Sequence, residues 1–388
     1  MNVISEVKSI EKDIINWRRE LHQIPEYSFD LYKTSRFVQD KLKKFNIEYR
    51  IAANTGVIAT IYGSRPGKTV AVRADMDALP IKEETNLPFS SKNDFMHACG
   101  HDAHSAILLG AAKILSEHKD EINGNVRLIF QPAEETTGGA KIMIDEGCLE
   151  NPKVDCIIGL HIGSLFKEVG NGKIGIKKGS VDSFSVKIRG NGGHGALPHM
   201  CVDPIVASAE IITSLQRIIS RELNPLHGGV ITVGMISGGT DFNIIPEEVM
   251  FKGTIRLLDK DDRDFVGKRV KEIISETARA GRTTADIDYN QYYPAVVNND
   301  FITDKLGESA KDIVGYQNVV SINEAALTAE DVSYYLNEVP GTFFILGSSK
   351  RNEDGNFYPH HHPKFDIDES VLWIGTATFL QFIKDYLK

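Results

Sequence analysis

Two spacings of hydrophobic residues alternate along the first half of the chain and predict alternating helices and strands. Residues 28–46 and 104–122 repeat apolar positions at three- and four-residue intervals, which is typical of amphipathic helices. Apolar runs at residues 69–77, 125–135 and 154–163 predict buried strands, the second of which ends at its proline. Such alternation favours a three-layer α/β domain with a largely parallel sheet.

The pattern changes near Lys178, and we predict a second domain there. From residue 183 hydrophobic and polar residues alternate, as in an antiparallel strand with one exposed face, and a glycine-rich turn follows. The next segments predict a helix, two strands, a helix and a strand, which completes the β-α-β-β-α-β order of a small α+β unit. We therefore predict a first domain made of residues 1–179 and 292–388, with residues 180–291 inserted as the second.

Composition and charge narrow the class of protein. The 388 residues are 41% hydrophobic and 25% charged, as in an ordinary soluble protein with room for two domains. A net charge of −9 argues against a nucleic-acid partner, and it means that an anionic ligand needs a local cationic anchor. The first residues lack the apolar core of a signal peptide, and no segment is long and apolar enough to predict a membrane span. The four cysteines show no paired spacing, so we expect reduced thiols in the cytoplasm.

Residues 96–105, "MHACGHDAHS", concentrate three histidines, a cysteine and an aspartate just before an apolar helix. Cys99 and His101 lie two residues apart there, and thiolate and imidazole are side chains that hold borderline-soft divalent metals. An isolated pair of this kind is more often a buried thiol beside a surface histidine. The metal interpretation therefore depends on further ligands elsewhere in the chain.

Two adjacent carboxylates, Glu134 and Glu135, follow the predicted strand that ends at Pro132. The end of a strand in an α/β sheet is where ligand sites form, and neighbouring residues in extended backbone point to opposite sides. One carboxylate could therefore bind a metal while the other faces a bound water. The alternative is a solvated acidic loop or a helix N-terminus, where carboxylates are also favoured.

Histidines at two more places complete a possible ligand set. His161 ends the strand at residues 154–163, and residues 360–362 form a run of three histidines. This run is internal and lies between prolines, so we reject an expression tag. Five ligands suit two metal ions that share a bridging water. The candidate set is Cys99, His101, Glu135, His161 and one of the final histidines.

Nine short motifs then follow one another over almost the whole chain. They are "RADMDALP", "HACGHDAH", "QPAEE", "GLH", "GGHGALPH", "NIIPEE", "GTIR", "AED" and "HHP". In these motifs and their order, the chain resembles the amidohydrolase branch of the aminoacylase-type metallopeptidases. That branch includes hippurate hydrolase, N-acyl-amino-acid amidohydrolases and plant indole-acetyl-amino-acid hydrolases.

The resemblance implies a role for each candidate residue of the first domain. Glu134 would be the general acid and base, and Asp75 and Asp77 would support the ligands from outside. His97 and His104 would be structural neighbours. The last ligand would be His361, two residues before Pro363, while His360 and His362 remain open. The implied metal ligands are Cys99, His101, Glu135, His161 and His361.

The resemblance also implies a role for the inserted domain, which would be a ferredoxin-like lid and dimerisation domain. His194 would stabilise the oxyanion, often from the partner subunit of a dimer or higher homo-oligomer. Asn243 and Arg256 would hold the free carboxylate of the substrate, since a guanidinium matches a carboxylate with its bidentate fork. Arg256 would then be the cationic anchor that an acidic protein needs.

The implied activity is cleavage of N-acyl-L-amino acids, of the N-acetyl or N-benzoyl type, with two divalent ions such as zinc, manganese, cobalt or nickel. Dipeptides and N-acetyl-diaminopimelate are alternative substrates that the motifs do not separate. A non-catalytic metal-stabilised binding protein is a more distant alternative. Glu134 argues against it, because a degenerate relative should lose its base first.

Overall fold

The structure is a computed structural model that describes residues 1–163, 172–176, 179–257, 260–322, 330–351, 355 and 357–388. The chain divides into two compact units. Unit 1 comprises Met1–Lys177, Val296–Glu324 and Asp331–Lys388, and unit 2 comprises Lys178–Ala295 and Ala325–Glu330. Each unit has its own sheet and its own core.

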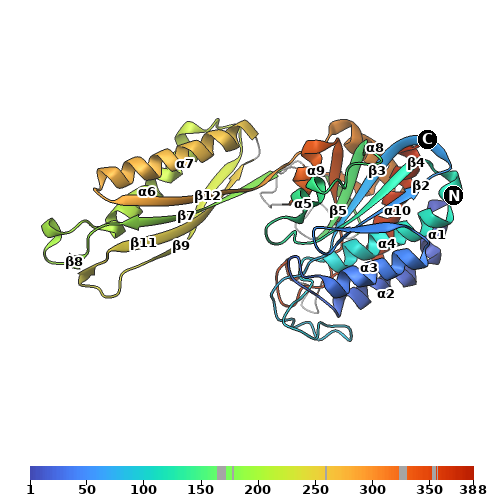
Figure 1. Cartoon of the computed structure of the whole chain (residues 1–388), viewed down its shortest axis with the longest axis horizontal. Coiled ribbons are helices and arrows are strands. Elements are labelled where there is room, and N and C mark those ends of the chain that lie inside the picture. Colours follow the sequence, from blue (N-terminus) through green and yellow to red (C-terminus); the bar gives the residue numbers. More distant parts are fainter. Residues whose placement is uncertain (164–171, 177–178, 258–259, 323–329, 352–354, 356) are drawn as a thin grey trace. The chain divides into compact units, whose positions relative to one another are not determined.

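Unit 1 is built on an eight-stranded sheet with the order β1-β2-β4-β3-β5-β14-β6-β13 (Figure 1). The four central strands β4, β3, β5 and β14 are mutually parallel, whereas β2 runs antiparallel to both of its neighbours, β1 and β4. The strands are β1 (Tyr49–Ala52), β2 (Gly56–Tyr62), β3 (Arg65–Asp75), β4 (Asn123–Gln131), β5 (Cys156–Gly163), β6 (Ile174–Ile176), β13 (Val319–Ser321) and β14 (Gly341–Gly347).

Helices cover both faces of this sheet because alternate residues of the buried strands point to opposite sides. In β3, for example, Val70 and Val72 belong to one core and Ala71 to the other. The larger core includes residues of α1 (Val3–Ser9), α2 (Glu11–His22), α3 (Tyr32–Lys44), α4 (His101–Glu117), α8 (Asp300–Val314) and α10 (Leu372–Tyr386). The smaller core includes residues of α5 (Gly139–Asp145) and α9 (Val332–Glu338). Unit 1 is thus the three-layer α/β domain that the sequence predicts.

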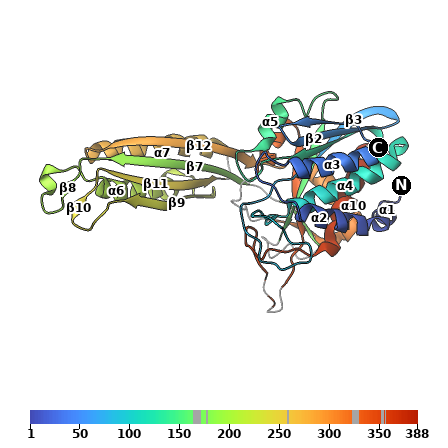
Figure 2. The same cartoon turned by 60° about the horizontal axis from the view of Figure 1, so that its bottom comes forward.

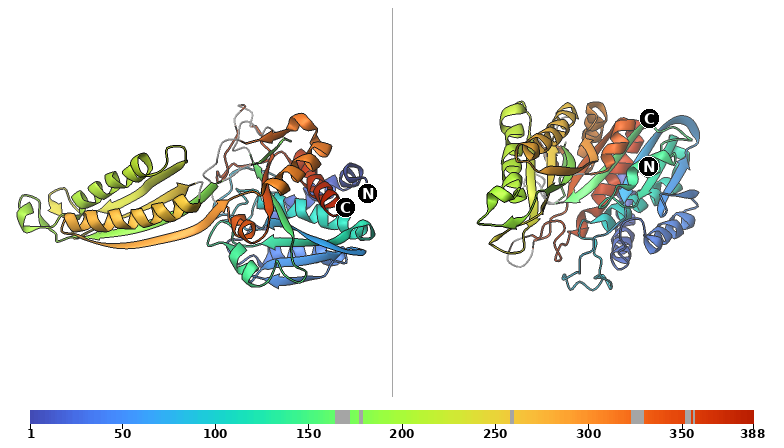
Figure 3. Two further views of the ribbon diagram at one scale, coloured as in Figure 1. Left: turned by 90° about the horizontal axis from the view of Figure 1, so that it is seen from above. Right: turned by 60° about the vertical axis from the view of Figure 1, so that its left-hand side comes forward.

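Unit 2 is a four-stranded sheet with two helices on one face (Figure 3, left). Its strands β7 (Gly179–Arg189), β9 (Gly229–Gly238), β11 (Glu248–Leu257) and β12 (Thr284–Val296) are arranged in the order β12-β7-β11-β9. Helices α6 (Pro204–Arg217) and α7 (Lys260–Ala280) pack on them through apolar residues such as Ile211 and Val270. Asp203 caps α6 by accepting a hydrogen bond from the Ile205 N–H, and Pro204 occupies the first turn. This is the ferredoxin-like arrangement expected of the inserted segment.

The predicted α/β class is confirmed, with one difference in the sheet of unit 1. The sequence predicts a largely parallel sheet, whereas the observed sheet is mixed, because β1 and β2 add an antiparallel edge and β6 runs antiparallel to β14. The apolar runs on which the prediction relied lie in β3, β4 and β5, which are parallel to one another. No helix in the described ranges combines enough length and apolarity to cross a membrane.

Candidate metal centre

The candidate ligands of unit 1 gather at one edge of its sheet. Strands β3, β4 and β5 are parallel, so their carboxyl ends meet at this edge, which is where α/β sheets form ligand sites. Asp75 ends β3, Glu134 and Glu135 follow β4, and His161 lies near the end of β5. The start of α4 and the segment before α10 bring Cys99, His101 and His361 to the same place.

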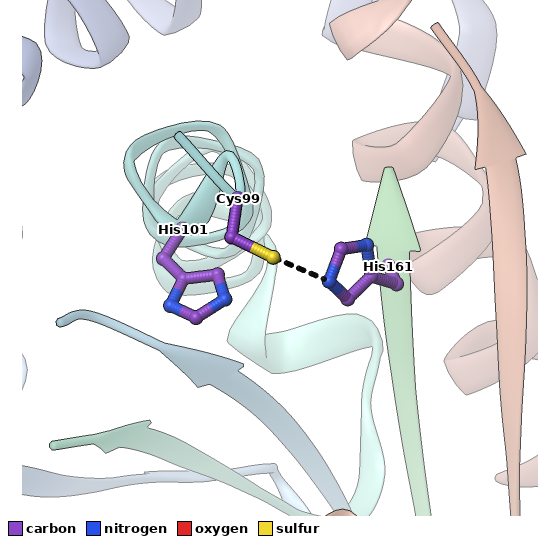
Figure 4. Close-up of side chains that lie close together, drawn as sticks. All are labelled: Cys99, His101 and His161. Atoms are coloured by element: carbon purple, nitrogen blue, oxygen red, sulfur yellow. Dashed lines mark hydrogen bonds between the residues drawn. The ribbon is translucent and has the colours of Figure 1, made fainter. Parts of the chain in front are cut away.

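Cys99, His101 and His161 offer ligand atoms that all lie within 4.8 Å of one another. The Cys99 Sγ lies 3.4 Å from the His161 Nε2, the contact drawn as a dashed line in Figure 4. The His161 Nδ1 donates to the Ile162 carbonyl oxygen at 2.5 Å, which leaves its Nε2 as an acceptor facing the thiol. These residues come from the start of α4 and from β5, two elements that are distant in sequence.

Two residues in left-handed backbone conformation let these segments approach each other. Gly100 has φ 85°, and a Cβ at this position would lie 2.3 Å from the Ile162 side chain, so a larger residue would separate Cys99 from β5. His361 has φ 66°, and its N–H donates to the Ala98 carbonyl at 2.9 Å. This hydrogen bond holds His361 against the loop that carries Cys99.

His361 is the member of the histidine run that joins the cluster. Its Nε2 lies 3.2 Å from the Glu135 Oε1, and Cys99, Glu135 and His361 form another group of close ligand atoms. His360 instead packs its ring on Phe365, with centroids 4.7 Å apart. His362 stacks on Tyr358 and accepts a hydrogen bond from the Lys364 N–H. These placements favour His361 over its two neighbours as the ligand.

Glu134 and Glu135 lie beside His101 rather than in solvent. The three residues form a third group of close ligand atoms, and Glu134 is only 7% exposed. Ala133, at φ 59°, turns the chain sharply between the end of β4 and this pair. The Glu135 N–H donates to Asp77 at 3.0 Å, which fixes the turn. A solvated acidic loop, the alternative reading of this motif, is therefore wrong.

Asp77 and Asp75 accept hydrogen bonds from the Nδ1 atoms of His101 and His104. The His101 Nδ1 donates to the Asp77 Oδ1 at 3.2 Å, which directs its Nε2 toward Glu135 at 3.9 Å. Asp75 accepts from the His104 Nδ1 at 2.5 Å, and the His104 Nε2 in turn accepts from the Ile162 N–H at 2.9 Å. Carboxylates that bind the outer nitrogen of an imidazole in this way set its tautomer and orientation.

The donor set fits a divalent cation. The His101 Nε2 is buried and makes no hydrogen bond among the described residues, a costly state that a bound cation would relieve. Burial lowers the pKa of His101, but the carboxylates of Asp75, Asp77 and Glu135 outweigh it and raise the pKa to about 10. Burial and the charges of Glu135 and Glu134 raise the pKa of the Cys99 thiol. The cluster therefore concentrates negative charge where a cation would bind.

A buried network behind Asp75 is a supporting feature that sequence reasoning missed. Arg73 donates to Asp75 at 2.7 Å, to Asp331 at 2.7 Å and to the side chain of Gln131 at 2.9 Å. Gln131 also donates to Asp331 at 2.6 Å. The motifs "RADMD", "QPAEE" and "AED" contain these residues, but no local pattern indicates that their side chains meet.

The candidate residues of unit 2 lie in two different places. His194 is in β8 (Gly193–His194), which pairs with β10 (Ile244–Ile245) (Figure 2). Asn243 directly precedes β10, and the side chains of His194 and Asn243 are both exposed. The Ala196 N–H donates to the His194 Nδ1 at 3.1 Å, so in the neutral ring the Nε2 carries the hydrogen. Arg256 lies near the carboxyl end of β11, opposite Val230 of β9. Strand β11 is about 25 Å long from Glu248 to Arg256, and Asn243 precedes Glu248, so Asn243 and Arg256 lie toward opposite ends of this strand.

Known proteins resemble this chain over nearly its whole length. A thermostable carboxypeptidase 1 from Saccharolobus solfataricus is 41% identical over 96% of this chain and 94% of its own. An N-acetyl-L-cysteine deacetylase from Bacillus subtilis is 40% identical over 96% and 88% of the two chains. The crystal structure of the Bacillus subtilis YXEP protein, described as a dinuclear metal-binding peptidase of the M20 family, superposes with a TM-score of 0.80 at 32% identity and covers 98% of this chain and 99% of its own.

The sequence profile of peptidase family M20/M25/M40 matches residues 71–385. This span contains every candidate ligand and the base candidate Glu134. The resemblance inferred from the motifs is therefore confirmed. The chain belongs to peptidase family M20/M25/M40 and is a metal-dependent hydrolase of amide bonds.

Proposed function

We propose that this protein hydrolyses the amide bond of N-acyl-L-amino acids and that Glu134 is its general base and acid. The observation that carries the proposal is that Glu134, which is buried, and Glu135 both lie beside His101. The other candidate ligands close by are Cys99, His161 and His361. One carboxylate of the pair is available as a ligand and the other as a proton carrier. The relative that is named an N-acetyl-L-cysteine deacetylase supports an N-acyl amino acid as the substrate class.

The residues divide the chemistry among them. Cys99, His101, Glu135, His161 and His361 would hold two divalent ions, and such ions lower the pKa of water and polarise the carbonyl group. Glu134 takes the proton from the attacking water and passes it to the departing amine, since an amide anion is too poor a leaving group. Asp77 keeps the outer nitrogen of His101 protonated, so that its Nε2 faces the centre.

Unit 2 supplies the remaining groups in this proposal. The His194 Nε2 carries a hydrogen and is the donor for the oxyanion, while Asn243 and Arg256 hold the carboxylate of the substrate. Asn243 and Arg256 lie toward opposite ends of β11, which is about 25 Å long from Glu248 to Arg256, so we infer that they reach one substrate from two copies of the chain. We therefore include a homo-oligomer, a dimer or larger, in the proposal.

The edge of the unit 2 sheet supports self-association. Strand β9 is at the end of the strand order, and Val230, Met235 and Ile236 are 41%, 45% and 56% exposed on it. An exposed edge strand with apolar side chains is a template for pairing with a second chain. The same strand of a second copy is the simplest partner.

The metal and the compartment are also part of the proposal. Thiolate and imidazole favour zinc, cobalt or nickel, and the carboxylate also accommodates manganese. All four cysteines are free thiols, which fits the reducing cytoplasm.

A second candidate is cleavage of a C-terminal residue from a peptide. The relative that is named a thermostable carboxypeptidase favours it, and the free carboxylate of such a substrate would use the same two residues, Asn243 and Arg256. N-acetyl-diaminopimelate is a further candidate of the N-acyl class.

A hydrolysis screen separates these candidates. Purified protein is incubated with N-acetyl and N-benzoyl amino acids, N-acetyl-diaminopimelate and dipeptides, each with zinc, manganese, cobalt or nickel, and free amine is measured. We expect the highest kcat/KM on an N-acyl amino acid and a loss of turnover when its carboxylate is amidated. Turnover confined to dipeptides, or no dependence on the carboxylate, would contradict the proposal.

A further inference from the structure

The last turns of α2 contain two buried polar side chains that the proposed chemistry does not use. Arg18 is 1% exposed and His22 is fully buried. Both side chains reach Asp102, in the first turn of α4, at 2.8 Å from the Arg18 Nε and 2.7 Å from the His22 Nδ1. Asp102 directly follows the candidate ligand His101.

The same two side chains also bind the other segments that carry the centre. The His22 Nε2 lies 3.2 Å from Glu83, which accepts a hydrogen bond from the Ser91 N–H and belongs to the loop after Asp77. The Arg18 Nη1 donates to Glu369 at 3.1 Å, beyond His361 in the sequence. We call Arg18, His22, Glu83 and Asp102 the Asp102 cluster.

Apolar side chains as well as the ionic groups of this cluster dock α2 on α4. Apolar side chains of α2 already pack there, for example Ile14, whose Cδ1 would lie 2.9 Å from a Cβ at Gly110. Buried ion pairs contribute little net stability compared with apolar side chains of the same size. What they add is a defined position for the backbone that carries them, and here that backbone is adjacent to the ligands.

The groups of the cluster contact one another directly in the protein interior. The Asp102 carboxylate has two partners on α2, the Arg18 guanidinium and the His22 ring, and the His22 ring has a second partner in Glu83. Rotation of the first turn of α4 would separate these buried groups and leave a buried charge without its partner, which is costly.

We propose that Arg18 and His22 are positioning residues for the metal centre. They hold Asp102, and through it the first turn of α4, so that His101 and Cys99 face Glu135 and His161. The motif "WRRELH" near the N-terminus thereby contributes to metal affinity without supplying a ligand. This inference rests on the proposed metal centre.

Two pairs of variants test it. His22→Asn keeps an amide N–H near the place of Nδ1, and His22→Gln keeps one near the place of Nε2, so only the first preserves the contact with Asp102. Arg18→Met removes the charge, and Arg18→Lys retains it. Ile14→Val on the same helix is the control for a general loss of packing.

Cobalt(II) is the probe, and competition with a chelator gives the dissociation constant of cobalt for each variant. The Tm of each metal-free variant is measured as well. We expect Arg18→Met and His22→Gln to bind cobalt about 10–100-fold more weakly, as for other groups that orient metal ligands. We expect His22→Asn and Arg18→Lys to recover part of this loss, and Ile14→Val to bind as the wild type does. The visible spectrum of bound cobalt should change in the two weak variants.

The outcomes separate this inference from the proposed function. If the wild type binds no cobalt, the metal centre itself is wrong and the positioning role falls with it. If the wild type binds cobalt and Arg18→Met and His22→Gln bind it equally well, only the positioning role is wrong. The positioning role is also wrong if Ile14→Val weakens cobalt binding as much as Arg18→Met and His22→Gln do, with a comparable loss of Tm.

Discussion

The carboxyl edge of the unit 1 sheet, here called the metal edge, and the β8–β10 end of unit 2 both contain candidate catalytic histidines. The two regions differ in how buried these histidines are and in what binds their rings. His101 is fully buried and its Nδ1 is bound to Asp77. His194 is exposed, and the hydrogen bond at its Nδ1 comes from a backbone N–H two residues away. Every candidate ligand of unit 1 has a partner from a distant part of the chain, whereas His194 depends on a local turn.

The difference indicates which part of the site one chain builds alone. A cluster of buried charges is stable only when its partners are fixed, so the metal edge must be formed together with the fold of unit 1. An exposed imidazole without a protein partner has a small free-energy cost because water solvates it. It is therefore available to bind a substrate or a second copy of the chain. Changes at the metal edge should therefore affect both stability and activity, and changes at the β8–β10 end should affect activity alone.

The largest effect is expected at Glu134. Glu134→Gln retains the size of the side chain but cannot accept the proton, so turnover should fall by about 10²–10⁴-fold. Metal content, measured by elemental analysis, should stay at the wild-type value because Glu134 is not a proposed ligand. Wild-type turnover in this variant would remove Glu134 as the base.

Asp75→Asn should cause the next largest effect, which is a lower free energy of unfolding. It removes the charged partner of His104 and one of the two carboxylates paired with Arg73, and breaking a buried ion pair costs about 3–5 kcal/mol. Urea denaturation of the metal-free protein measures the free energy of unfolding. A cost below about 0.5 kcal/mol, as for surface substitutions, would mean that the metal edge is not held by its charges.

His194→Ala should behave in the opposite way. Loss of an oxyanion donor lowers kcat by about 10²–10³-fold, while an exposed side chain contributes within about 0.5 kcal/mol to folding. Steady-state kinetics and Tm measured on the same preparation give both quantities. Unchanged kinetics would mean that His194 has only a structural role in its turn. A large fall in Tm would contradict the expected difference in stability effects between the two regions.

The smallest effect is a pH dependence at Glu83. Burial raises the pKa of Glu83, but His22 outweighs it and lowers the pKa from 4.5 to about 2. The stabilisation from ionised Glu83 is therefore present above pH 4.5 and is lost as the pH falls toward 2. Glu83→Gln should lower the Tm of the metal-free protein at pH 6, and the difference should vanish near pH 2. Glu247→Gln, an exposed change in unit 2, is the control and should leave Tm unchanged at both pH values.

Much of the fold, and the gathering of the candidate ligands, could be predicted from sequence for reasons visible in particular segments. Strands β3, β4 and β5 are buried on both faces, so their apolar runs are continuous and their ends are easy to locate. Parallel strands end at one edge, so Asp75, Glu135 and His161 could be expected to meet. Strand β2 also carries a buried run, since Val57 and Ile61 belong to one core and Ile58 to the other, whereas β1 is mostly exposed. Neither strand was among those predicted.

The support around the ligands could not be predicted from local pattern. Arg73 and Asp331 are 258 residues apart in sequence, and Arg18 and Glu369 are 351 apart. Their contacts depend on how helices and strands pack, which periodicity does not encode. The conformation of His361 is similar, since its left-handed φ is favoured by a backbone hydrogen bond to Ala98 and has no signal in the histidine run itself.

The most direct test of the central claim is anomalous X-ray diffraction from crystals of the zinc-loaded protein. The account predicts two anomalous peaks per chain at the carboxyl edge of the unit 1 sheet, with Cys99, His101, Glu135, His161 and His361 as the protein ligands and Glu134 beside them without direct coordination. A single peak, a peak elsewhere, or a Cys99 Sγ turned away from both ions would contradict it.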